Sequence, residues 1–114
     1  MSNNIIEFKD FLKVDIRVGT VITAKLSEGL KKPYIILQID FGKNIGIKKS
    51  SAQLTANYVP KKLVNKQVAA VVNFKPKQIG NLISEVLVLG FPDLDKEPIL
   101  FSPDKKIENG SKIF

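Results

Sequence analysis

The residues of this sequence that could act chemically are lysines gathered in its middle. Residues 41–90 carry eight lysines and one acidic residue, Glu85, whereas residues 1–40 and 91–114 are each close to neutral. The whole chain has a net charge of +7. A clustered cationic excess is typical of a surface that binds a polyanion such as nucleic acid. A lysine-rich solubilising surface would give the same charge, so the charge alone leaves both readings open.

Missing residue types narrow the chemistry further. The sequence contains no cysteine and no histidine, which excludes thiol nucleophiles, histidine bases and Ser-His-Asp triads, and argues against a zinc site. It also lacks the glycine-rich loops that cradle nucleotide phosphates. An enzyme would need a cleft of Asp, Glu, Lys or Tyr with perturbed pKa values, and nothing indicates one. We therefore expect no catalysis, no metal and no cofactor.

The length and composition predict one folded domain over residues 1–114. The chain is 44% apolar and 25% charged, which is normal for a globular domain. No apolar run approaches the roughly 20 residues needed to span a bilayer. The first residues lack the basic and apolar regions of a signal peptide. We expect a cytoplasmic protein with no membrane span.

Five β-rich segments and one short helix must position the lysines. Apolar periodicity and turn residues predict strands at 15–25, 34–41, 44–49, 67–74 and 84–90, and a helix at 52–58. Three strands, a short helix and two strands is the order of an OB-fold, a five-stranded Greek-key barrel. The expected fold class is therefore all-β, an OB-fold barrel with N- and C-terminal extensions.

Local signals set the expected boundaries. Gly19 indicates a bulge or bend within the first strand, and a polar loop is expected at 27–33. Ser50 or Ser51 is a plausible N-cap for the helix, and Pro60 is expected to end it. Residues 42–44 and 75–81 are expected to form turns, and a short run at 98–101 belongs to the tail.

Two of the expected strands are apolar on both faces. The segments 68–72 and 86–89 lack the alternation of a strand with one face in water. The C-terminal tail or a second copy of the chain could cover the outer face, and we expect both, with a two-fold homodimer. Several apolar residues near the chain ends could form either the dimer seam or a groove for polypeptide: Phe8, Phe11, Leu12, Phe91, Phe101 and Phe114.

Three short motifs carry a family resemblance. They are Asp-Ile-Arg-Val-Gly at 15–19, Asn-Phe-Lys-Pro-Lys at 73–77 and Ser-Glu-Val-Leu at 84–87. Together they resemble the tRNA-binding domain family, an OB-fold module appended to some aminoacyl-tRNA synthetases and also found as free-standing dimers. Segments 45–55, 65–68 and 84–90 are similar to members of the family that serve as protein-secretion chaperones. The resemblance covers about residues 8–113.

The resemblance implies a set of RNA-binding residues. By motif match, the resemblance assigns RNA binding to Lys48, Asn73, Lys77, Ser84 and Glu85. The charge and loop positions add Lys75, Arg17, Lys61 and Lys62 as candidates. The sequence departs from the family at Gln78, Ala56 and Asn57, where relatives tend to be basic, which could shift the RNA surface towards Lys61 and Lys62.

Structural roles stay open for several of these residues. Arg17 could pair with Asp15, Asn73 and Ser84 could cap turns, and Glu85 could hold a neighbouring lysine. Lys61, Lys62 and Lys66 could lie on a solvated loop.

The expected function is binding of tRNA by a homodimer, mainly through phosphate and shape contacts. Only 8% of the residues are aromatic, and we expect Phe74 and Tyr58 in the core, so base stacking has little support. The alternative is an export chaperone that binds unfolded or precursor polypeptides.

Overall fold

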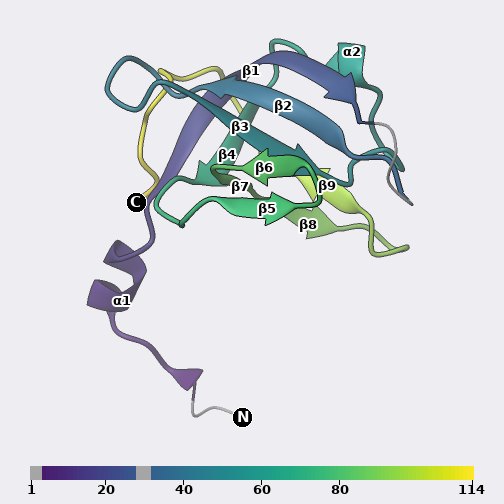
Figure 1. The fold of residues 1–114 in the computed structure, drawn as a ribbon. Coiled ribbons are helices and arrows are strands. Elements are labelled where there is room, and N and C mark those ends of the chain that lie inside the picture. Colours follow the sequence, from purple (N-terminus) through teal and green to yellow (C-terminus); the bar gives the residue numbers. More distant parts are fainter. Residues whose placement is uncertain (1–3, 28–31) are drawn as a thin grey trace.

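The computed structural model describes residues 4–27 and 32–114. The chain folds into a small β-barrel with an arm at its N-terminus (Figure 1). The elements are α1 (Phe8–Leu12), β1 (Ile16–Leu26), β2 (Ile35–Asp40), β3 (Ile47–Ala52), α2 (Pro60–Leu63), β4 (Gln67–Val71), β5 (Lys77–Ile79), β6 (Leu82–Ser84), β7 (Leu87–Val88), β8 (Gly90–Pro92) and β9 (Pro98–Leu100).

The main sheet has five strands in the order β3-β2-β1-β4-β7, and all its neighbours are antiparallel. The short strand β6 packs against β3 and nearly closes the sheet into a barrel. This arrangement confirms the expected all-β OB-fold. Strands β5 and β6 form a hairpin that crosses the front of the barrel in Figure 1.

Alternating apolar side chains fill the barrel. Ile35, Leu37 and Ile39 of β2 are fully buried, and Val21 of β1 and Val68 of β4 belong to the same core cluster. The intervening residues of β2 point outwards, as the two-residue period of a strand requires. Leu63 of α2 packs against this core and is also fully buried.

The first strand is irregular, but not where the sequence indicated. Its register with β2 shifts between Val21 and Thr23, so the bulge lies at Ile22 rather than at Gly19. Gly19 instead allows a close approach of β2. A Cβ there would lie 2.6 Å from Cγ2 of Ile39 and 2.9 Å from the carbonyl oxygen of Asp40.

The third strand and the helix differ from the expectation. β3 occupies Ile47–Ala52, so Ser50 and Ser51 are buried strand residues paired with β2 and do not cap a helix. Residues 53–59 form turns and irregular chain rather than the expected helix. The helix α2 begins at Pro60, because proline lacks an N–H and is favoured in the first turn of a helix, where that N–H has no partner.

The last expected strand is also divided. β6 and β7 are separated by a bend at Glu85 and Val86, and the segment 75–81, expected to be a turn, contains β5. β4 ends at Val71, short of the expected Phe74. The polar loop expected at 27–33 lies largely outside the described residues.

The C-terminal tail covers the outer face of β1 and β4, as the apolar pattern indicated. The backbone N–H of Ala69 donates to the carbonyl oxygen of Phe101 at 2.8 Å, and Val18 N donates to Ser111 O at 3.1 Å. Ala69 and Val18 are buried as a result. The tail thus replaces solvent over the outer face of β4, a strand that is apolar on both faces.

The N-terminal arm extends away from the barrel (Figure 1). Its helix α1 has a capping box in which Glu7 and Asp10 satisfy each other's backbone N–H groups. Four apolar side chains of the arm are at least half exposed: Ile5, Ile6, Phe8 and Leu12. No described part of the chain covers them.

Candidate nucleic-acid interface

A polar groove runs across the outer face of β1, β2 and β3 beneath the β5–β6 hairpin. Its volume is about 540 Å³. We call it the outer groove. Its lining residues are Thr23, Lys25, Ile36, Gln38, Lys49, Ser51, Asn81, Leu82 and Ile83.

Strand register places the groove side chains in rows. Thr23 of β1 pairs with Gln38 of β2, and Gln38 pairs with Lys49 of β3. The Thr23 hydroxyl donates to Oε1 of Gln38 at 2.9 Å, which fixes the amide within the row. Lys25 lies in the next row, and both lysines are exposed. The groove therefore presents two cations and an ordered amide, with no acidic residue in its lining.

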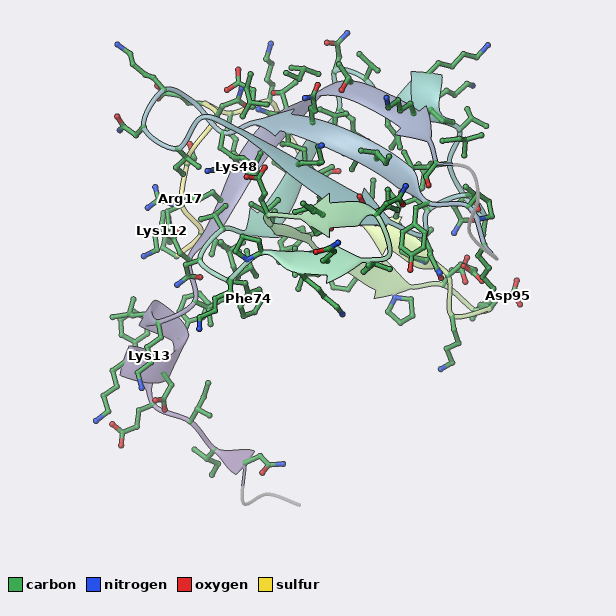
Figure 2. The ribbon with its side chains drawn as sticks, viewed as in Figure 1. Lys13, Arg17, Lys48, Phe74, Asp95 and Lys112 are labelled. Carbon is green, nitrogen blue, oxygen red and sulfur yellow. The ribbon has the colours of Figure 1, made fainter. Side chains whose placement is uncertain are left out.

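Lys48 does not face this groove. It pairs with Ile39, whose side chain is in the core, so Lys48 points to the core side of β3 at the barrel end and is half-buried. Figure 2 shows it towards the same end of the barrel as Arg17. Lys49, its neighbour, takes the groove position because successive strand residues point to opposite faces.

Lys75 and Lys77 border a second cavity, of about 440 Å³, beside the β5–β6 hairpin. Both lysines are exposed. We call it the hairpin cavity. Its other lining residues are mostly apolar or small: Ser50, Ser51, Ala52, Phe74, Ile79, Ser84, Glu85, Val86, Leu87 and Val88.

Phe74 is not in the core, contrary to the expectation. Its side chain is 55% exposed at the edge of the hairpin cavity (Figure 2). Tyr58 does pack against the core, and its hydroxyl accepts a hydrogen bond from Leu100 N at 3.0 Å.

Ser84 and Glu85 join the two edges of the barrel. The Ser84 hydroxyl accepts from the N–H of Ser51 at 2.8 Å. One carboxylate oxygen of Glu85 accepts from the N–H of Lys49 at 2.9 Å, while Glu85 N donates to Lys49 O at 2.7 Å. Both side chains thus make intrachain bonds that fix the β6 edge beside the outer groove.

Asn73 and Arg17 also make intrachain bonds. The Asn73 side chain accepts from Asp15 N at 3.0 Å and donates to Lys13 O at 2.8 Å, which ties the arm to the barrel. The Arg17 guanidinium binds Asp15, with Nε 2.6 Å from Oδ1, and reaches Gly110 O at 3.0 Å. The ion pair is about 70% buried, and it holds the tail against β1.

Lys61 and Lys62 are exposed on α2, at the far end of β1 from the arm (Figure 1). Neither lines the outer groove or the hairpin cavity. The structure brings together Lys75 and Lys77 with Ser84 and Glu85, and leaves Lys48, Arg17 and the two α2 lysines outside that group.

Sequence reasoning missed Lys25, Lys49, Thr23 and Gln38. The signal that could have found them is strand parity, because Gln38 lies between two core residues of β2 and must face outwards. Within the described parts of the chain, no cluster of acidic residues suits a metal ion, and no helix is long and apolar enough to cross a membrane.

Comparison with known proteins identifies relatives over nearly the whole chain. Residues 16–112 match the family model described as "Putative tRNA binding domain". A methionine–tRNA ligase from Parabacteroides distasonis is 33% identical over 110 residues, which are 95% of this chain but 16% of the ligase. The chain thus spans about a sixth of the length of that relative.

Two solved structures are similar over their full length. The chaperone CsaA from Bacillus anthracis is 44% identical, with a TM-score of 0.88 over 96% of this chain and 99% of that one. The CsaA chaperone protein from Picrophilus torridus is 49% identical, with the same TM-score over 96% and 100%. These structures confirm that the chain is similar to chaperone members of the family, as its motifs indicated.

Proposed function

The chain belongs to the tRNA-binding domain family, and we propose on that basis that it is a non-catalytic module that binds tRNA. A tRNA partner implies work in the cytoplasm. Recognition rests on phosphate and shape contacts, because exposed aromatic side chains are few on the groove face.

The observation that carries the proposal is the outer groove. OB-folds bind oligonucleotides on the face of strands 2 and 3, between the loops that follow strands 1 and 4. The outer groove lies on this face, and Lys25 and Lys49 give it a positive charge, with no acidic residue among its lining residues. Such a site neutralises phosphates and releases their counterions.

The lysines around the groove extend this contact. Lys75 and Lys77 approach the RNA from the hairpin, and Lys48, Lys61 and Lys62 contribute weaker phosphate contacts at the barrel ends. Arg17, Asn73, Ser84 and Glu85 act mainly through the chain itself. Their intrachain bonds hold the strands that carry the lysines.

Salt dependence tests the mechanism. We expect the logarithm of tRNA affinity to fall linearly with the logarithm of salt concentration, by about 0.7–0.9 for each neutralised phosphate. The double variant Lys25→Ala/Lys49→Ala should weaken binding several-fold and lower that slope by roughly 1.4–1.8. Fluorescence anisotropy with labelled tRNA between about 50 and 200 mM salt measures both quantities.

A charge-matched control separates groove contacts from net charge. Lys9→Gln/Lys96→Asn removes two exposed lysines, one on the arm and one at the β8–β9 turn, and Asn suits the positive φ of Lys96. The control should bind nearly as the wild type does. Binding insensitive to salt, or a groove variant that matches the control, would contradict the proposal.

We further propose that the protein is a homodimer. The four exposed apolar residues of the arm favour burial against a second copy, since a monomer rarely leaves such a stretch in water. Light scattering should give twice the 12.7 kDa mass of one chain. Ile6→Asp/Phe8→Asp should yield monomers, whereas Leu94→Asp, at a fully exposed hairpin tip, should not. A wild-type mass of one chain at micromolar concentration overturns the dimer.

A second candidate function is binding of unfolded polypeptide, favoured by the hairpin cavity. Its apolar lining and bordering lysines suit an extended chain with apolar and acidic side chains. Leu87→Asn should abolish peptide binding without adding charge beside the lysines, and so should spare tRNA binding, with Leu94→Asn as the control. Absence of any peptide binding rejects this function.

Competition shows how the two functions relate. Because Lys75 and Lys77 border the hairpin cavity, excess tRNA should displace a bound peptide. A peptide that stays bound in the presence of tRNA would mean that the two ligands use separate surfaces.

A further inference from the structure

A third cavity, of about 330 Å³, lies between the C-terminal tail and the entry to β4. We call it the tail cavity, formed by residues 65–67, residues 102–106 and Thr20. It brings Lys66 together with Lys105 and Lys106, which lie about forty positions later in the sequence. The tail is close to neutral as a sequence segment, so its charge composition gave no indication of this cluster.

Hydrogen bonds hold the tail on both sides of the cavity. Gln67 donates to Ile107 O at 2.7 Å and accepts from Ile107 N at 3.0 Å. The Thr20 hydroxyl donates to Oδ1 of Asn109 at 2.8 Å. At the other side, Phe101 O accepts from Ala69 N. The backbone of segment 102–106 is therefore held in place at both of its ends. This places Lys105 and Lys106 near Lys66 in the protein without a ligand.

The cavity has the chemistry of an anion site. Three lysines face one acidic residue, Asp104, and none of the three forms an ion pair within the described parts of the chain. The hydroxyl of Ser102 is buried and has no hydrogen-bond partner among the described residues. A buried polar group without a partner is unfavourable, which favours a ligand that brings a hydrogen-bond acceptor, such as a phosphate oxygen, to this hydroxyl.

The tail cavity adjoins the outer groove along β1. Thr20 lines the former and Thr23 the latter, and about 10 Å of strand separates them. One RNA strand can therefore pass from Lys25 to the tail lysines without leaving the protein surface. We propose that the tail cavity binds a backbone phosphate of the same RNA that occupies the outer groove. This inference rests on the proposed tRNA binding.

The test removes the tail charge. Lys105 and Lys106 are exposed, so Lys105→Ala/Lys106→Ala should fold normally, which a thermal melt verifies. We expect this variant to bind tRNA several-fold more weakly than Lys9→Gln/Lys96→Asn, with a salt slope lower by about 0.7–0.9, as expected for one lost phosphate contact. Ser102→Ala should weaken binding with little change in slope, because it removes a donor and no charge.

The outcomes separate this inference from the proposed function. If Lys25→Ala/Lys49→Ala weakens tRNA binding and the tail variant equals its control, the inference fails and the function stands. If wild-type protein binds no tRNA, both fail. In a second arm, inorganic phosphate is titrated into free protein and followed by amide chemical shifts. Saturable phosphate binding at residues 102–106, with tRNA affinity unchanged in the tail variant, overturns the assignment to RNA.

Discussion

The hydroxyl of Ser84 lies 2.8 Å from the backbone nitrogen of Ser51, and this bond joins β6 to β3 where the barrel closes. The same hydroxyl donates to Ser51 O at 3.3 Å, so one side chain serves both backbone groups of a buried residue. A short side chain thus takes the place of a ladder bond at the edge of the outer groove.

Removing that hydroxyl should destabilise the barrel. Ser84→Ala leaves the buried N–H of Ser51 without its acceptor, and we expect the free energy of unfolding to fall by about 1–3 kcal/mol. Urea denaturation measures the loss as a lower midpoint at an unchanged m value. Thr55→Ala, on an exposed turn, should stay within about 0.5 kcal/mol of the wild type. A Ser84 variant as stable as this control would contradict the closing role.

Gly19 should tolerate no side chain. A Cβ at this position would lie 2.6 Å from Ile39 Cγ2 and 2.9 Å from the carbonyl oxygen of Asp40, and the backbone atom cannot move aside. We expect Gly19→Ala to cost roughly 1–3 kcal/mol or more in unfolding free energy. Gly46→Asn is the comparison, because Gly46 has a φ of +87° with open space around it, and Asn tolerates that conformation. Equal melting temperatures for the two variants would argue against the close approach.

Much of the barrel could be predicted because its strands alternate regularly. β1 and β2 were expected almost at their observed bounds, and in β2 the core residues recur at every second position. The β3 region misled the prediction, because two serines before an apolar stretch resemble a helix N-cap, and Pro60 can end one helix or begin another. Only the burial of both serines in the closed barrel decides between these readings.

The candidate site was harder to predict than the fold. Lys48 was named because it lies in a segment that matches the family, and a motif match does not show which of two adjacent lysines faces outwards, so Lys49 was not named. Ser84 and Glu85 were chosen by motif, and the structure adds the hydrogen bonds that those side chains make. Nothing in the sequence indicated Lys105 and Lys106 as binding residues, because their nearness to Lys66 depends on how the tail crosses the barrel.

Acid should loosen the β8–β9 hairpin through Asp93. Hydrogen bonds from the Asn57 side chain, and from the backbone of Glu97 and Asp95, hold the pKa of this carboxyl below its ordinary value. The stabilisation is complete above the ordinary pKa of about 3.9 and is lost as the pH falls through the lower native value. The thermal midpoint of the wild type should therefore fall more steeply below about pH 4 than that of Asp93→Asn. If the thermal midpoints of the two proteins fall in parallel as the pH is lowered, the Asp93 carboxylate contributes nothing to stability.

Lys48 and Lys49 provide the sharpest test of the groove, because they are adjacent and face opposite sides of β3. Lys49→Ala should weaken tRNA binding several-fold and lower the salt slope by about 0.7–0.9, as expected for one lost phosphate contact. Lys48→Ala removes the same charge from a half-buried position at the barrel end, and its effect on affinity and slope should be smaller. Anisotropy titrations of both variants at two salt concentrations give the comparison. Since the net charge is identical in the two proteins, a larger effect at Lys48 would move the interface from the outer groove to the barrel end.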